Sequence, residues 1–168
     1  MTIASDLLPE FDLEMQSTRK LLAIVPAARA AWRPHAKSWT LGDLSMHIAN
    51  LAEWMAITLT TTELDFNPPG GPQFPVRKFA SPEATLAEFD ANVQRARAAL
   101  AKSADADFAV VWSLKNAGQK ILAMPRSMCV RGFVMNHMIH HRGQLSLYLR
   151  LCDVPLPRVY GPTADTPD

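Results

Sequence analysis

The segment from about Ser127 to Cys152 is the part of the sequence that most constrains the fold. It predicts one helix that is apolar nearly all round, and such a helix is stable when other elements bury it. The rest of the chain must supply those elements. With 168 residues, of which 48% are hydrophobic and 20% charged, the chain suits a single domain, residues 1–168, with a buried core.

Three further stretches have apolar residues at helical spacing. They run from about residue 6 to 24, from 41 to 62, and from 81 to 100. The second begins after Thr40, whose spacing from Asp43 is that of a capping box. The third has Ser81 as N-cap and Pro82 at the first helical position. Four long helices without alternating strands predict an all-α fold, a four-helix bundle.

Two segments fall outside this helical pattern. Residues 107–125 carry Asn-Ala-Gly between two β-prone runs, which predicts a short hairpin or extended segment between the third and fourth helices. The proline-rich tail from Asp153 onward is expected to lie on the surface as an extended strap.

Charge and cysteine content restrict the partners and the compartment. The formal net charge is +1 without any block of like charges, so no nucleic-acid partner is expected. Neither a signal peptide nor a membrane span is recognisable, and we expect a cytoplasmic protein with no membrane partner. Cys129 and Cys152 lie on one predicted helix, roughly 34 Å apart, so they cannot pair, which agrees with a reducing compartment.

Three histidines within five residues of the last helix are the main functional signal. His137 and His141 are four residues apart, which places two imidazoles on one face at a separation that suits one metal ion. His140 is three residues from His137 and could substitute for His141. A third ligand must come from another helix, and His47 is the natural candidate. The competing interpretation is that these are core histidines satisfied by hydrogen bonds.

Three stretches carry a family resemblance. The sequences WTLGDLSMHIANLAEW, NHMIHHRGQLSLYLRL and VPLPRVYGPTAD resemble the signature stretches of the DinB family, the DNA-damage-inducible-like metalloenzymes. The resemblance implies a four-helix bundle with up-down-down-up topology, often a homodimer, that holds a divalent metal on three histidines. Carried over by position, the ligands are His47, His137 and His141, and His140 does not bind.

Such a site indicates catalysis. Three neutral imidazoles leave a coordination position open, and zinc or nickel is expected, with iron and manganese as alternatives. The ion would activate water or a thiol as nucleophile. Neither Asp43, a capping residue, nor Glu53 is a convincing general base, so no catalytic residue is assigned.

We therefore expect a metal-dependent enzyme, a thiol S-transferase or a hydrolase acting on a small electrophilic substrate. Some relatives of the family use low-molecular-weight thiols, which makes such a thiol the implied partner. The alternative is a non-catalytic metal-bound binding or stress-response module.

Three neighbours of the histidines carry further expectations. Gln144 returns to the face of His137 and could orient a ligand. Arg142 could attract an anionic substrate or form a salt bridge on the bundle surface. Gly143 costs about 1 kcal/mol inside a helix relative to alanine, which suggests a close helix contact.

Overall fold

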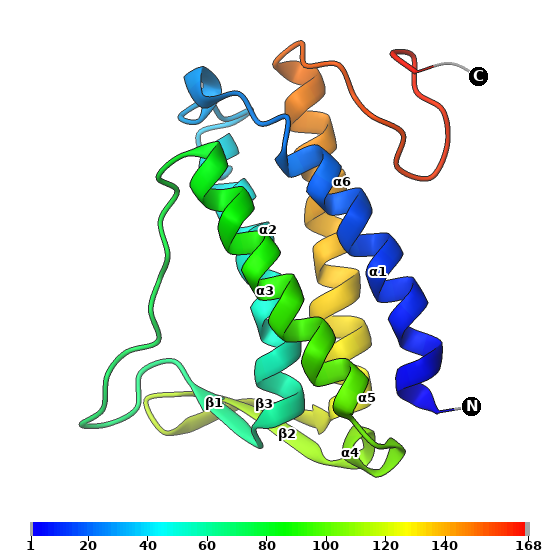
Figure 1. The fold of residues 1–168 in the computed structure, drawn as a ribbon. Helices are drawn as coiled ribbons and strands as arrows, with labels where there is room; N and C mark the ends of the chain where they lie inside the picture. Colours follow the sequence, from blue (N-terminus) through cyan, green and yellow to red (C-terminus); the bar gives the residue numbers. More distant parts are fainter. Residues whose placement is uncertain (1, 167–168) are drawn as a thin grey trace.

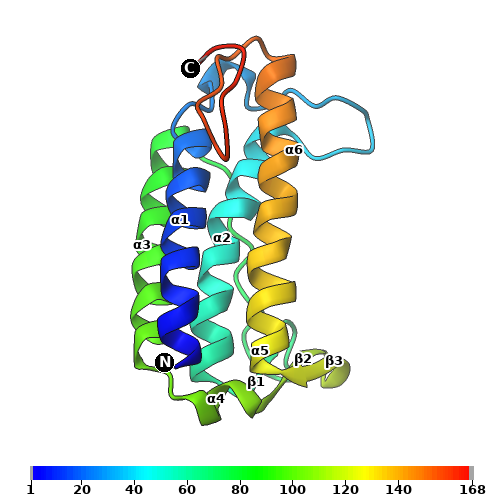
Figure 2. The same cartoon turned by 90° about the vertical axis from the view of Figure 1, so that its right-hand side faces the viewer.

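The computed structural model describes residues 2–166 and is mostly helical. Four long helical segments lie side by side (Figure 1). They are α1 (Ile3–Leu22), α2 (Leu41–Thr60), α3 (Pro82–Lys102), and a last segment made of α5 (Arg126–Met128), the π-helical η2 (Cys129–Asn136) and α6 (His137–Leu151). The chain rises through α1 and the last segment and descends through α2 and α3 (Figures 1 and 2).

Capping side chains determine where three of these helices begin. The Thr40 and Ser81 hydroxyls accept hydrogen bonds from backbone N–H groups three residues on, at 3.0 and 3.1 Å, each worth about 1 kcal/mol. The predicted starts of the second and third helices are confirmed. The first helix begins three residues before the expected Asp6, because Thr2 caps it in the same way.

The core lies between the helices and receives large side chains from each of them. Phe11 of α1, Ile48 of α2, Phe89 of α3 and Leu145 of α6 are all fully buried. Each such side chain contributes about 1.5–3 kcal/mol on burial. The helix α2 packs against both α3 and the η2–α6 segment, and this central position later places its side chains in the site.

A small three-stranded sheet lies across one end of the helices (Figure 1). Its strands are β1 (Glu63–Asp65), β2 (Val111–Asn116) and β3 (Gln119–Pro125). The pair β2–β3 is antiparallel and forms the hairpin predicted for residues 107–125. The short strand β1, which pairs with β2 in parallel, and the short helix α4 (Asp105–Ala109) were not predicted. The strand β1 has only three residues, which is too few to show the alternation of apolar and polar residues by which a strand is recognised.

The hairpin turn and the sheet's attachment have clear physical causes. Ala117 and Gly118 both have positive φ, 51° and 78°, as a two-residue hairpin with right-handed strand twist requires. The buried Trp112 donates its indole N–H to Thr61 Oγ1 at 3.1 Å. Arg126, also buried, donates to the Thr61 carbonyl at 2.7 Å. These bonds join the sheet to the C-terminal end of α2.

The tail after α6 turns back over α1 and α6 (Figure 2). Arg142 forms an ion pair with Glu14 at 2.6 Å, with only 3% and 9% of the side chains exposed. The Tyr160 hydroxyl donates to Glu14 at 2.8 Å and accepts from Arg142. The expected salt bridge of Arg142 is thus present, but it is buried between α1 and α6 and does not lie on the bundle surface. Arg142 does not line the cavity beside the histidines. It joins the tail to two helices.

Gly143 also departs from expectation. A Cβ built there meets no other atom within 4 Å, so a close helix contact within the chain does not explain the glycine.

No helix within residues 2–166 is long and apolar enough to cross a membrane.

Candidate metal centre and adjoining cavity

The helices α2 and α6 run in opposite directions and bring three histidines together. One ring nitrogen each from His47, His137 and His141 lies within 4.8 Å of the others. The ring centroid of His47 is 5.2 Å from that of His137 and 4.6 Å from that of His141. His140 is exposed and outside this set, so of the two alternatives the structure brings His141 into the cluster.

Hydrogen bonds fix the tautomers of the two histidines on α6. His137 Nδ1 donates to the Phe133 carbonyl at 3.3 Å, and His141 Nδ1 donates to Gln144 Oε1 at 2.7 Å. Each ring then carries its free lone pair on Nε2. Gln144 thus orients a candidate ligand, as the sequence suggested, and partners of this kind are typical of metal-binding histidines.

The remaining ring nitrogens of His137 and His141 face each other at hydrogen-bonding distance, with their Nε2 atoms 2.9 Å apart. With both Nδ1 atoms acting as donors, each Nε2 presents a lone pair to the other. The Nε2 atom of His47 is buried without a hydrogen-bond partner within residues 2–166. Ligands at about 2.0–2.1 Å from a tetrahedral zinc ion lie about 3.3 Å apart. The cluster therefore has the donor set, and nearly the spacing, that a divalent cation requires.

Burial keeps all three rings neutral. It lowers the pKa of His47 to about 4, with smaller contributions from the nearby His141 and His137. Burial is also the largest cause of the lowered pKa values of His137 and His141. Neutral imidazole is the form that binds metal, so the rings need not lose a proton at pH 7 before they bind an ion.

Trp39 covers the histidines on one side. Its ring stacks on His141, with centroids 5.5 Å apart and planes 18° apart, and meets His47 edge-on at 4.5 Å. Trp39 is itself 47% exposed, so its indole lies between the cluster and solvent. Trp39 lies in an irregular connector, so no helical spacing predicts its contact with the histidines.

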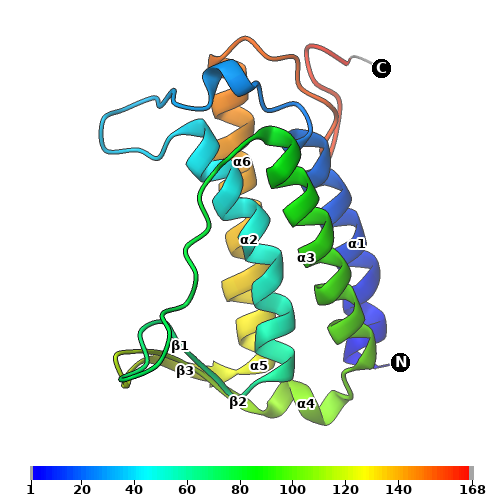
Figure 3. The ribbon, with the colours of Figure 1, turned by 60° about the vertical axis from the view of Figure 1, so that its left-hand side comes forward.

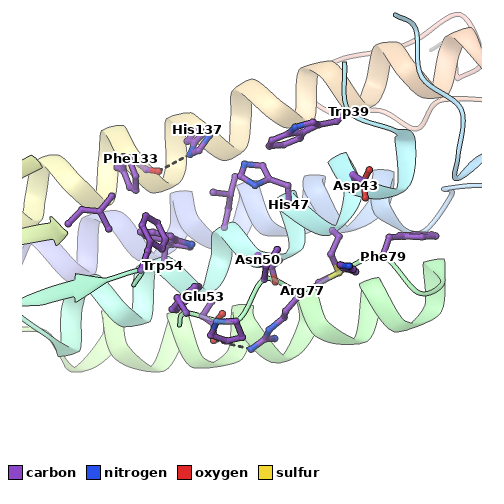
Figure 4. Close-up of a pocket in the computed structure, with 18 residues that line it drawn as sticks. Trp39, Asp43, His47, Asn50, Glu53, Trp54, Arg77, Phe79, Phe133 and His137 are labelled. Carbon is purple, nitrogen blue, oxygen red and sulfur yellow. Dashed lines mark hydrogen bonds and ion pairs between the residues drawn. The ribbon is translucent and has the colours of Figure 1, made fainter. Parts of the chain in front are cut away.

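A cavity of about 750 Å³ adjoins the histidines and extends along α2 toward the sheet (Figure 4). The connector between β1 and α3 forms its outer wall, running beside α2 (Figure 3). The lining of the cavity is mostly apolar and rich in aromatic rings. The aromatic lining residues are Trp39, Trp54, Phe66, Phe74, Phe79 and Phe133.

Comparisons with known proteins agree on one family. The sequence matches the model of the DinB family over residues 2–167. The chain belongs to the DinB family. It is 25% identical over 158 residues to the uncharacterized protein YrdA of Bacillus subtilis strain 168, an alignment that covers 94% of this chain and 88% of YrdA.

Two solved structures share the DinB fold. A DinB-like protein from Bacillus cereus ATCC 10987 superposes with a TM-score of 0.70 at 23% identity, covering 95% of this chain and 98% of that one. The DinB-like protein YjoA from Bacillus subtilis also has a TM-score of 0.70, at 15% identity, covering 92% of this chain and 97% of that one. At these identities the likeness concerns the fold.

Neither carboxylate that the sequence singled out in this DinB chain is placed as a free base. Asp43 lines the cavity, but its carboxylate accepts the Thr40 hydroxyl at 2.7 Å, which fits its position at the start of α2. Glu53 accepts from Arg77 at 3.3 Å (Figure 4), and Arg77 also pairs with Glu88 of α3. Glu53 also pairs with Arg95 of α3 at 3.8 Å, so its charge links α2 to the connector and to α3.

Proposed function

We propose that this chain is a divalent-metal-dependent enzyme and that His47, His137 and His141 are the metal ligands. The observation that carries the proposal is the convergence of one ring nitrogen from each histidine, all within 4.8 Å of one another. His137 Nε2 and His141 Nε2 are 2.9 Å apart, and with both Nδ1 atoms acting as donors each presents a lone pair to the other. His47 Nε2 is buried without a hydrogen-bond partner within residues 2–166. Two lone pairs repel unless a cation lies between them, and burying a polar nitrogen without a partner is costly.

The donor set favours zinc or nickel, with iron and manganese as alternatives. Three protein ligands leave a coordination position open, as in catalytic zinc sites. When bound, the ion supplies Lewis acidity that lowers the pKa of a water or a thiol and so provides a nucleophile. The chain's own residues do the rest: Gln144 and the Phe133 carbonyl orient the rings, and Trp39 shields them from solvent.

The cavity supports a small apolar electrophile as substrate. We propose thiol S-transfer, with a low-molecular-weight thiol as second substrate, or hydrolysis as the reaction. Neither reaction requires a carboxylate base when the ion activates the nucleophile. The proposal also treats residues 1–168 as one domain, an up-down-down-up four-helix bundle of the DinB type that forms a homodimer.

The first test measures the metal content of the purified, untagged protein. The wild type, His47→Ala and His141→Ala are dialysed against zinc or nickel, and bound metal is determined by elemental analysis. His140→Ala is the matched control, because His140 is adjacent but exposed and outside the cluster. We expect about one equivalent in the wild type and the control, and none in the other variants. Metal retained by both cluster variants, or absent from the wild type, would overturn the proposal.

Turnover separates the enzyme from a non-catalytic binding module. The metal-loaded protein is mixed with cysteine and chlorodinitrobenzene to detect thiol transfer, and with nitrophenyl acetate to detect hydrolysis. We expect one of these reactions to accelerate in the wild type and in His140→Ala but not in His47→Ala. A loaded protein without either activity favours the binding module.

A further inference from the structure

Two levels of packed side chains from α2 and the last segment line the cavity. His47 of α2 faces His137, with centroids 5.2 Å apart, and Trp54, two turns further along α2, faces Phe133, with centroids 5.4 Å apart. Because the helices are antiparallel, the order along α2 is reversed along the last segment. We call His47, His137 and His141 the histidine level, and Trp54 and Phe133 the aromatic level. Figure 4 labels His47, His137, Trp54 and Phe133.

The aromatic level is wider than one pair of rings. Phe66, which follows β1, lies 5.5 Å from Trp54, and Phe74 of the connector lies 6.0 Å from it. All four rings line the cavity. Their centroid separations are those of directly packed aromatic rings, so they present a continuous apolar wall. A planar or aromatic group is the natural occupant of this end of the cavity.

Asn50 lies between the two levels. It follows His47 by three residues and precedes Trp54 by four, so the three side chains share one face of α2, with Cβ atoms about 5–6 Å apart at each step. Asn50 lines the cavity, and its Oδ1 is buried without a hydrogen-bond partner within residues 2–166. A buried carbonyl oxygen without a donor is an unsatisfied hydrogen-bond acceptor, and an N–H or O–H group of a bound molecule would satisfy it.

The two carboxylates that line the cavity are already engaged. Glu53 and Arg77 contact each other at 3.3 Å, and Asp43 accepts the Thr40 hydroxyl at 2.7 Å. The carboxamide of Asn50 can rotate about χ2, because this torsion has a broad range in asparagine. Such a rotation turns Oδ1 toward the cavity, where it can accept a hydrogen bond from a bound molecule.

Resting on the proposed function, we infer that Asn50 determines substrate specificity by accepting a hydrogen bond from the middle of the substrate. The substrate class then has three parts in a fixed order. A metal-binding end lies at the histidine level, an amide N–H or hydroxyl meets Asn50, and a planar or aromatic group lies at the aromatic level.

Three small thiols test this order on the zinc-loaded protein by isothermal titration calorimetry. N-Benzyl mercaptoacetamide has all three parts. Benzyl mercaptoacetate, its ester, lacks the N–H donor, and N-methyl mercaptoacetamide lacks the aromatic group. In the wild type we expect the benzyl amide to bind about tenfold more tightly than the ester. We also expect it to bind more tightly than the N-methyl amide.

Asn50→Leu keeps the side-chain volume and removes the carboxamide. We expect this variant to bind one equivalent of zinc and to bind the benzyl amide and the ester with equal affinity. Asn50→Ala serves as a second variant with the same expectation if the leucine variant does not fold.

The two proposals fail in different ways. Equal affinity for amide and ester in the wild type, or a tenfold preference retained in both variants, would overturn the role of Asn50 while the metal site stands. A zinc-loaded wild type that binds none of the thiols would contradict the open coordination position, and with it the proposed function.

Discussion

Replacing Gln144 by leucine tests whether the histidine cluster is built to bind metal. Gln144 Oε1 accepts the His141 Nδ1–H bond at 2.7 Å and has no place in the cluster itself. Removing such a partner typically lowers metal affinity 10- to 100-fold. A thirtyfold loss corresponds to about 2 kcal/mol. For a chain of this size, about 2 kcal/mol reduces the metal-induced rise in melting temperature by about 4–8 °C.

The assay compares melting curves with and without zinc at one fixed free zinc concentration. Without zinc, Gln144→Leu should lose no more than about 1 kcal/mol of stability, the worth of one hydrogen bond. Gln144→Glu is the matched control, because a carboxylate also accepts from Nδ1–H and should keep the zinc-induced rise. If Gln144→Leu binds zinc within twofold of the wild type, His141 does not depend on this bond, and the interpretation of its tautomer is wrong.

Three further outcomes follow from individual contacts. The pKa of His47 is lowered from 6.5 to about 4, so in metal-free protein the unfolded state binds more protons between these pH values. The free energy of unfolding should therefore fall as the pH drops from 6.5 toward 4, and urea titrations of His47→Leu should show a weaker fall. Glu14→Gln leaves the buried Arg142 without its counter-charge and should cost about 3 kcal/mol in thermal denaturation. The control Asp90→Asn, which breaks an exposed pair, should cost less than about 1 kcal/mol. Because the Trp39 ring stacks on His141, nickel should quench wild-type tryptophan fluorescence, and Trp39→Phe should bind nickel with little quenching.

Local rules predicted the parts of the site that lie on regular helices. The spacing of His137 and His141 depends on helix geometry alone, and the structure brings these residues together with His47. The starts of α2 and α3 were equally readable, because a cap and its partner are three residues apart in sequence. The histidine spacing and the two helix starts each depend on residues three or four positions apart, so they can be read from the sequence of a single helical turn.

Features that depend on long-range contacts gave no such signal. Trp39 reaches the histidines from an irregular connector, and Arg142 is buried only because Glu14 of α1 and Tyr160 of the tail meet it. On α6 alone an arginine is indistinguishable from a surface charge. The π-helical geometry of η2 was not predicted from the sequence either. A π-helix differs from an α-helix in pairing residues five apart, and this change leaves the apolar composition of the segment the same.

The cavity also depends on long-range contacts, and Gly42 offers a way to disturb it without touching the histidines. A Cβ at Gly42 would lie 2.8 Å from the Phe79 ring and 3.2 Å from the Ala30 carbonyl, so the ring must move, and Phe79 lines the cavity. Gly42→Ala should lose about 1–3 kcal/mol of stability through overpacking. It should still bind one equivalent of zinc, and it should bind N-benzyl mercaptoacetamide more weakly than the wild type in calorimetry. Gly143→Ala is the matched control: its Cβ meets nothing, so it should gain about 0.5–1 kcal/mol and keep the wild-type affinity. If Gly42→Ala instead has the melting temperature of the wild type and its affinity for N-benzyl mercaptoacetamide, the Phe79 ring moves aside without loss of stability. The connector would then not shape the cavity.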